Sequence, residues 1–314
     1  MQMLLSSCEV FLTDGFIYAV LAMGYYITYT ILDFPDLTVE GTVLTGGIIF
    51  SLLAITGLNP WICMIIAFVF GCIAGCVTGI LNVKLKIRPL LCGILVSTAL
   101  ITINLVVTVV GMGGNLKGED ALTNIPIGRD VTTILRSFPA KYIPQDFLGI
   151  NIRKLIIFFA VAVIFKILLD VFLKTKSGLL LRASGSNPNF VTMLAKNPGN
   201  SKILGLALGN GFAAVSGALI AQSRGNANQS MGLGMIVIGL ASLIIGLSVF
   251  SKVKFMKPST KVIFGSVIYQ ACLSIATFLG VPTAYNKLIM AILFTIALVI
   301  SGTIFKKKGS AVID

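Results

Sequence analysis

Three carboxylates lie close together near the N-terminus, in the stretch Asp33-Phe-Pro-Asp-Leu-Thr-Val-Glu-Gly41. We call residues 33–41 the acidic stretch. Pro35 lacks a backbone donor and disfavours helix at the residue before it, so a helix is expected to break here. The apolar segment that follows is short for a membrane span, which places part of the acidic stretch at membrane depth. A broken helix is tolerated at that depth only beside protein or a water-filled cavity.

The acidic stretch therefore predicts the lining of a solute pathway, because discontinuous helices often line such paths. The residues expected there are Asp33, Phe34, Pro35, Asp36, Thr38, Glu40 and Gly41. If the helix resumes after Pro35, Asp36 and Glu40 share one face. That face is expected to meet the pathway, with Thr38 and Val39 turned towards neighbouring helices. A plain loop between two helices is the alternative.

A second stretch of interest runs from Gly178 to Pro188 and on to Asn197-Pro198. Asn187 is a good N-cap, and Pro188 fits the first position of a helix. We expect a short amphipathic helix over residues 188–195, with an apolar face that presents Phe190, Met193 and Leu194. Such a helix in a basic loop is typical of a docking element for a partner. An ordinary connection between helices explains the same pattern.

Two further polar groups leave their roles open. One group of polar residues precedes an apolar run that is interrupted by glycines. Its amide and hydroxyl side chains could meet a polar solute, or could only cap helix ends: Asn226, Asn228, Gln229 and Ser230. Asp170 follows Lys166 by four residues within one apolar segment. An ion pair in a membrane is a functional candidate by default, but structural pairing is the interpretation that we favour.

Motifs for catalysis are missing from the sequence. It has no histidine, no GxxxxGK[ST] phosphate loop, no nucleophile elbow and no dinucleotide fingerprint. None of the six cysteines forms a CxxC pair, so a zinc site or a disulfide framework is not expected. We therefore expect no enzymatic activity, no bound metal and no cofactor in this chain.

The elements that must position these residues are apolar helices. The chain is 56% hydrophobic and 11% charged, with a mean hydropathy of +0.99, far from the roughly 25% charged residues of soluble domains. The apolar segments are continuous rather than alternating, which excludes a β-barrel. They cover residues 15–31, 41–55, 61–83, 90–110, 155–173, 203–221, 232–250, 262–279 and 288–305. The sequence predicts an all-α integral membrane protein, a bundle of about nine (8–10) transmembrane helices in a single domain, residues 1–314.

Two of these segments carry small residues at four-residue spacing. One row is Gly71, Gly75 and Gly79, and the other is Gly205, Gly209, Ala213 and Gly217. Such rows let helix backbones approach closely inside lipid. They predict tight helix packing rather than a chemical site.

Basic residues predict the orientation in the membrane. Lys and Arg are dense at residues 84–88, 174–202, 252–261 and 306–308. These groups fall on one side if nine helices alternate, and that side is expected to be cytoplasmic. Residues 174–202 then form a cytoplasmic loop, residues 111–154 an outer loop, and the C-terminus is cytoplasmic. The net charge of +13 is explained in this way, so no nucleic-acid partner is expected.

The two stretches described first resemble those of a known family. Asp33-Phe-Pro-Asp-Leu-Thr-Val-Glu-Gly41 and Gly178-Leu-Leu-Leu-Arg-Ala-Ser-Gly-Ser-Asn-Pro188 are similar to motifs in permease subunits of ATP-binding-cassette (ABC) importers of the branched-chain amino acid and ribose type. The resemblance is strongest to the tryptophan/tyrosine branch. It covers essentially the whole chain, although Asn189-Phe190 departs from the commonest form of the loop.

This resemblance implies a type II importer fold in a bacterial cell membrane. It implies a homodimer of this chain, two copies of a separate ATPase that carry ATP and Mg, and an extracellular or periplasmic solute-binding protein. The solute is expected to be an aromatic or other hydrophobic amino acid. The residues expected to couple to the ATPase are Arg182, Ala183, Ser184, Gly185, Asn187, Pro188, Phe190, Met193 and Leu194.

Two other classes of membrane protein remain alternatives. An ion-coupled secondary transporter would be expected to carry charged pairs in mid-helix, and only Lys166 and Asp170 approach that pattern. A structural membrane scaffold would not need a broken acidic segment.

Overall fold

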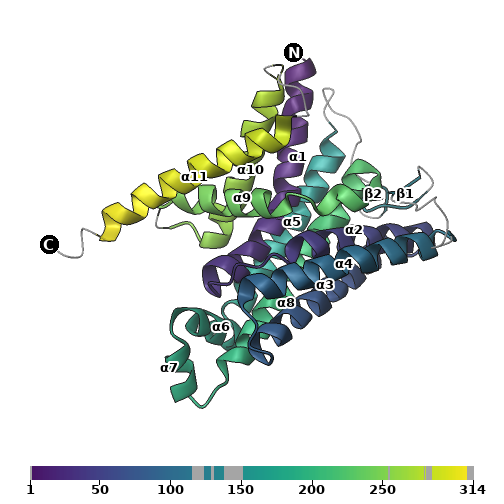
Figure 1. Cartoon of the computed structure of the whole chain (residues 1–314). Coiled ribbons are helices and arrows are strands. Elements are labelled where there is room, and N and C mark those ends of the chain that lie inside the picture. The colour runs from purple at the N-terminus through teal and green to yellow at the C-terminus, as the bar shows by residue number, and fades with distance from the viewer. Residues whose placement is uncertain are drawn as a thin grey trace. The chain divides into compact units, whose positions relative to one another are not determined.

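The computed structural model describes residues 2–114, 124–128, 131–137, 151–253, 255–278, 280 and 285–309. These residues are almost entirely helical (Figure 1). The α-helices are α1 (Gln2–Tyr25), α2 (Val39–Ile55), α3 (Pro60–Val83), α4 (Pro89–Gly111), α5 (Ile152–Phe172), α6 (Lys176–Ser186), α7 (Pro188–Met193), α8 (Pro198–Arg224), α9 (Met235–Val249), α10 (Pro258–Phe278) and α11 (Asn286–Gly309). A π-helix, η1 (Tyr26–Ile31), continues α1, and a 3-10 helix, η3 (Gln229–Gly232), precedes α9.

The observed helices agree with the predicted all-α fold of a membrane protein. Each predicted apolar segment coincides with a helix. Seven helices in the described part of the chain are long and apolar enough to cross a membrane: Ser7–Ile31, Pro60–Val83, Pro89–Gly111, Ile152–Phe172, Pro198–Arg224, Gln229–Val249 and Pro258–Phe278. Two further apolar helices, Val39–Ile55 and Leu288–Val299, are shorter. The predicted number of nine crossings is therefore not established by helix length.

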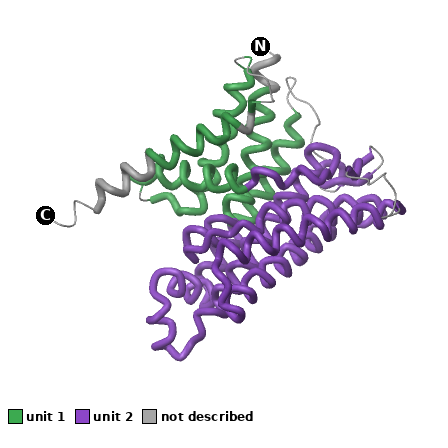
Figure 2. The backbone as a smooth tube through the Cα atoms, viewed as in Figure 1, with its two compact units in different colours: residues 1–23, 145–166, 236–314 green, residues 24–144, 167–235 purple. Residues whose placement is uncertain are grey.

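Contacts divide the chain into two compact units (Figure 2). The first comprises residues 1–23, 145–166 and 236–314, and the second comprises residues 24–144 and 167–235. In the first unit α10 packs on α1, where the Ser266 hydroxyl donates to the Gly15 carbonyl over 2.7 Å. The rings of Phe16 and Phe159 meet edge to face at 5.1 Å. These contacts join helices that are far apart in the sequence.

The second unit is held together by the predicted rows of small residues. A Cβ added at Gly75 would collide with the Leu206 carbonyl of α8, and one at Gly217 would collide with the Val43 carbonyl of α2. The helices α2, α3 and α8 thus touch through their backbones, and α4 runs beside α2 (Figure 1). The packing interpretation of the glycine rows is confirmed.

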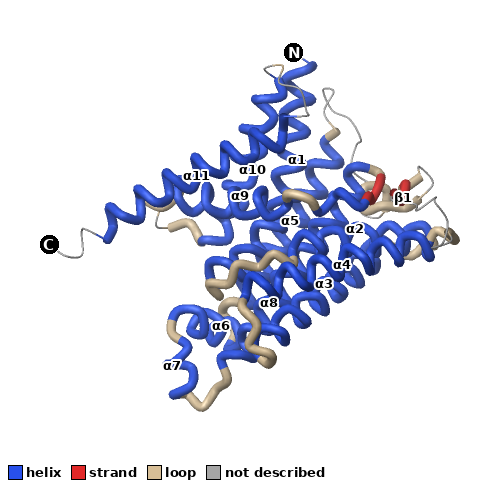
Figure 3. The backbone as a smooth tube through the Cα atoms, viewed as in Figure 1, coloured by secondary structure: helices blue, strands red, loops and turns tan. Residues whose placement is uncertain are grey.

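The predicted outer loop is structured where it is described. Its strand β1 (Asn124–Pro126) pairs antiparallel with β2 (Asn226–Asn228), with Ile125 opposite Ala227 (Figure 3). The backbone N–H of Ile134 donates to the Gln222 side chain of α8 over 2.9 Å. A short surface helix, which the loop's length would allow, is not seen in residues 124–128 or 131–137; the rest of the loop lies outside the described residues.

Candidate functional site

The acidic stretch breaks the first helix, as the sequence predicts. The π-helix η1 ends at Ile31, and the Phe34 N–H still reaches back to the Thr28 carbonyl over 2.9 Å. Asp33 then adopts a positive φ of 52°, a left-handed conformation that aspartate tolerates better than most residues. The π-helical turn is itself notable, because such turns are frequent at functional sites.

The helix resumes at Val39 and not directly after Pro35, so the condition for a shared face of Asp36 and Glu40 is not met. Helix α2 begins at Val39, with Thr38 in the N-cap position. Asp36 precedes the helix, so Asp36 and Glu40 are not one helical turn apart. The physical reason is that Asp36 turns back on its own backbone. Its Oδ1 accepts a 2.9 Å hydrogen bond from the Thr38 N–H, which holds the chain in a turn before α2 starts.

Asp36 is the centre of a buried polar cluster. The residue is 2% exposed, and its Oδ2 accepts a 2.6 Å hydrogen bond from the Asn210 amide of α8. The Asn210 oxygen in turn accepts from the Thr42 hydroxyl over 2.7 Å. A buried charge is costly unless it is hydrogen-bonded. These bonds therefore tie the break to both α8 and the first turn of α2.

Thr38 connects the same break to α3. Its hydroxyl lies 2.8 Å from that of Thr78, and the Thr78 hydroxyl is 3.2 Å from the Ala74 carbonyl. Thr78 can thus donate to Ala74 while it accepts from Thr38. Both threonines are fully buried. Thr38 faces α3, as the sequence predicts, and Val39 is buried, whereas Asp36 is buried against α8 instead of facing water.

Glu40 and Gly41 fix the start of α2 to two other segments. The Glu40 Oε1 accepts a 2.9 Å hydrogen bond from the N–H of Gly234, which directly precedes α9. A Cβ added at Gly41 would lie 2.9 Å from the Leu100 Cβ of α4. Glycine is thus required here by close approach.

Of the predicted pathway residues, the structure brings Asp36, Thr38, Glu40 and Gly41 together with α3, α4 and α8. Phe34 is also buried, at 2% exposure, while Asp33 and Pro35 are exposed and Glu40 is partly exposed. Lining of a solute pathway by these seven residues stays a prediction.

The predicted short helix is confirmed as α7. The Asn187 side chain caps it by accepting from the Phe190 N–H over 3.2 Å, and Pro188 occupies the first turn. The helix ends at Met193, two residues earlier than predicted, because Ala195 has a positive φ of 53°. Phe190, Met193 and Leu194 are exposed, Met193 to 84%, whereas Val191 is fully buried. Of the other predicted coupling residues, Arg182, Asn187 and Pro188 are exposed, Ala183 and Gly185 are partly exposed and Ser184 is buried.

Sequence reasoning missed helix α6, which lies between α5 and α7. We call residues 176–194, which hold α6 and α7, the docking segment. The Thr175 side chain caps α6 by accepting from the Gly178 N–H over 3.2 Å. A Cβ added at Gly185 would collide with the Ile31 carbonyl, and Gly205 of α8 lies against both Leu32 and Leu181. The docking segment therefore packs directly on the end of η1, where the helix breaks.

Three buried side chains of this region were also missed: Asn210, Thr78 and Tyr25. Asn210 and Thr78 complete the polar cluster, and Tyr25 is the last residue of α1. The signal for Asn210 was available, because an amide beside the glycine row of α8 is expensive in an apolar helix unless it has a partner.

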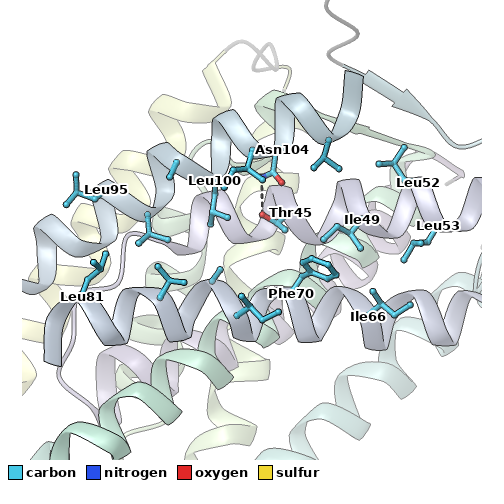
Figure 4. Close-up of a pocket in the computed structure, with 17 residues that line it drawn as sticks. Thr45, Ile49, Leu52, Leu53, Ile66, Phe70, Leu81, Leu95, Leu100 and Asn104 are labelled. Atoms are coloured by element: carbon cyan, nitrogen blue, oxygen red, sulfur yellow. Dashed lines mark hydrogen bonds between the residues drawn. The ribbon is translucent and has the colours of Figure 1, made fainter. Parts of the chain in front are cut away.

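An apolar cavity lies among α2, α3 and α4 (Figure 4). Its volume is about 620 Å³, and its walls are mostly aliphatic side chains together with Phe70. Its two polar wall residues bond each other, since the Asn104 amide donates to the Thr45 hydroxyl over 2.9 Å. The cavity thus suits an apolar group and offers little to orient a polar one.

Several long apolar helices, one of them broken and lined by buried polar groups, identify a polytopic membrane protein. The chain matches the family described as branched-chain amino acid transport system, permease component, over residues 7–298. It therefore belongs to this family of ABC transporter permeases, as the two motifs predict.

Two relatives extend the comparison. The chain is 40% identical to the tyrosine transport system permease protein of Clostridioides difficile (strain R20291). The aligned 281 residues cover 90% of this chain and 86% of the relative. The chain is 30% identical over 283 residues to an uncharacterized protein of Rickettsia prowazekii (strain Madrid E), covering 88% of this chain and 91% of that protein. No solved structure matches the chain.

Proposed function

We propose that this chain is the membrane-spanning subunit of an ATP-driven, binding-protein-dependent importer of an aromatic or other hydrophobic amino acid. ATP and Mg would be bound by a separate ATPase, two copies of which would dock on a homodimer of this chain. An external binding protein would deliver the solute. The family supports a transport role, and the name of the relative from Clostridioides difficile supports the class of solute.

The proposal of an ATP-driven importer rests on the exposure and packing of the docking segment. Helix α7 exposes an apolar face, and α6 packs on the end of η1 through Gly185. A partner that moves α7 would therefore act on the end of η1, where the helix breaks, through α6. Exposed apolar side chains on a short capped helix are suited to a protein contact, since burying them is favourable.

Transport in proteoliposomes tests the proposal. The permease is reconstituted with a candidate partner ATPase and a candidate binding protein, and uptake of radiolabelled tyrosine is measured with and without ATP. We expect uptake only when ATP, ATPase and binding protein are all present. Uptake by the permease alone, driven by an ion gradient, would identify a secondary transporter instead.

A further inference from the structure

Tyr25 holds a buried hydroxyl that has no hydrogen-bond partner among the residues that the structure describes. The side chain is 1% exposed, and no donor or acceptor of those residues reaches its oxygen. Leaving a buried polar group unpaired is unfavourable, so each such group calls for an explanation such as a ligand or an ordered water. Tyr25 is the last residue of α1, and η1 connects it to the helix break.

Two carboxylates accompany this hydroxyl. The backbone next to Tyr25 packs on the turn of α8 that holds the partner of Asp36: a Cβ added at Gly24 would lie 2.6 Å from the Gly209 carbonyl oxygen, and Asn210, which follows Gly209, donates to Asp36. The carboxyl groups of Asp36 and Glu40 lie within electrostatic range of the Tyr25 side chain. The donors that reach them from the described residues are neutral: the Thr38 N–H and the Asn210 amide for Asp36, and the Gly234 N–H for Glu40. Two carboxyl groups and one hydroxyl thus lie in the same region of the second unit, and no cationic side chain among the described residues hydrogen-bonds to either carboxyl group.

The two carboxyl groups and the hydroxyl together suit a cation that donates several hydrogen bonds. A primary ammonium has three N–H donors and no acceptor, and its hydrogen bonds to carboxylates are strong. The phenol oxygen can accept the third bond, and each carboxylate keeps an acceptor lone pair after its printed bonds are made.

We propose that Tyr25, Asp36 and Glu40 bind the ammonium group of the amino-acid solute as it passes the helix break. This inference rests on the proposed function, because an importer of amino acids carries that ammonium group through the membrane. Tyr25 and Asp36 are buried, so the solute reaches them when the contacts around the break open. The site recognises only the group shared by all amino acids, which leaves side-chain selection to other parts of the transporter.

The test uses Tyr25→Phe, which removes one oxygen, with Tyr29→Phe as the matched control. Tyr29 lies on η1 and is 40% exposed. In the complete reconstituted transporter, Tyr25→Phe is expected to lower tyrosine uptake about tenfold, as for the loss of one hydrogen bond to a charged group. Tyr29→Phe is expected to leave uptake unchanged. Because the hydroxyl is unpaired, Tyr25→Phe is also expected to leave the melting temperature equal or raised.

Ligand binding to the purified permease, measured as a change in melting temperature, tests this inference separately from the proposed function. At constant ionic strength, tyrosine and tyramine are expected to raise the melting temperature of the wild type. The analogue 3-(4-hydroxyphenyl)propionate, which lacks the ammonium, is expected not to, and Tyr25→Phe is expected to lose the response to both amines. An equal response to the propionate or to sodium ions would overturn the ammonium site, as would full uptake by Tyr25→Phe. A wild type that binds tyramine but imports no aromatic amino acid would instead reject the proposed function.

Discussion

The backbone carbonyl of Ile31 lies directly against Gly185, so the last turn of η1 and helix α6 touch with no side chain between them. The Ile31 carbonyl belongs to the helix that breaks at the acidic stretch. Gly185 belongs to the docking segment, eight residues before Met193. A movement of the docking segment must therefore shift the end of η1 or separate the two backbones.

Replacing Gly185 with alanine is expected to uncouple transport. The new Cβ would collide with the Ile31 carbonyl and force α6 away from η1, although α7 keeps its exposed face. We expect tyrosine uptake to fall at least about tenfold, while the ATPase still co-purifies with the permease. The control is Ser186→Ala, which changes an exposed neighbour on the same helix. Normal uptake by Gly185→Ala would show that this contact carries no coupling.

The hydrogen bond between Asp36 and Asn210 is expected to stabilise the helix break. In Asn210→Asp, two carboxylates would face each other in a buried site, and a lost bond to a charged group costs about 2 kcal/mol before repulsion is added. We expect a clear drop in melting temperature, measured in detergent. The double variant Asp36→Asn, Asn210→Asp restores one amide and one carboxylate and should recover most of the loss. Additive effects of the two substitutions would argue against a direct interaction.

The sequence predicts the helices of this protein better than their contacts. Continuous apolar runs mark the helices, Pro35 marks the break, and Asn187-Pro188 marks the start of α7, because each signal is local. The later start of α2 depends on the Asp36 side chain bonding to its own backbone and to Asn210, 174 residues away in the chain. Helix α6 was missed because Gly178, Gly185 and its serines favour a loop by local propensity, whereas packing on η1 and α8 stabilises the helix.

The exposed face of α7 is expected to bind the ATPase. Met193→Asp, Leu194→Asp places two charges where apolar contact is needed, and burying an unpaired charge is costly. We expect a stable permease that no longer co-purifies with the ATPase. Asn189→Asp is the control, because it adds an exposed charge at the start of the same helix, where an acid is favourable. ATP-driven uptake at the normal rate by the double variant would place docking elsewhere.

The basic segments predict a cytoplasmic docking segment and C-terminus. Single cysteines at position 186, in α6, and at position 130, in the long loop, test this orientation in intact cells. A membrane-impermeant thiol reagent is expected to label position 130 and to leave position 186 unlabelled until the cells are permeabilised. The reverse pattern would invert the topology, and with it the side on which an ATPase could bind.

A cysteine scan across the acidic stretch tests whether it lines the solute pathway. In the resting permease, cysteines at positions 33 and 35 are expected to react with a water-soluble thiol reagent, because Asp33 and Pro35 are exposed. Positions 36 and 38 are expected to be protected by α8 and α3, and position 40 to react partly. If the pathway opens at the break, trapping the transporter with bound ATP should change the reactivity at positions 36 and 40. Position 34 is the control for burial within the same stretch, since Phe34 is 2% exposed. Reactivities that stay the same in both states would leave the acidic stretch as a structural break that takes no part in transport.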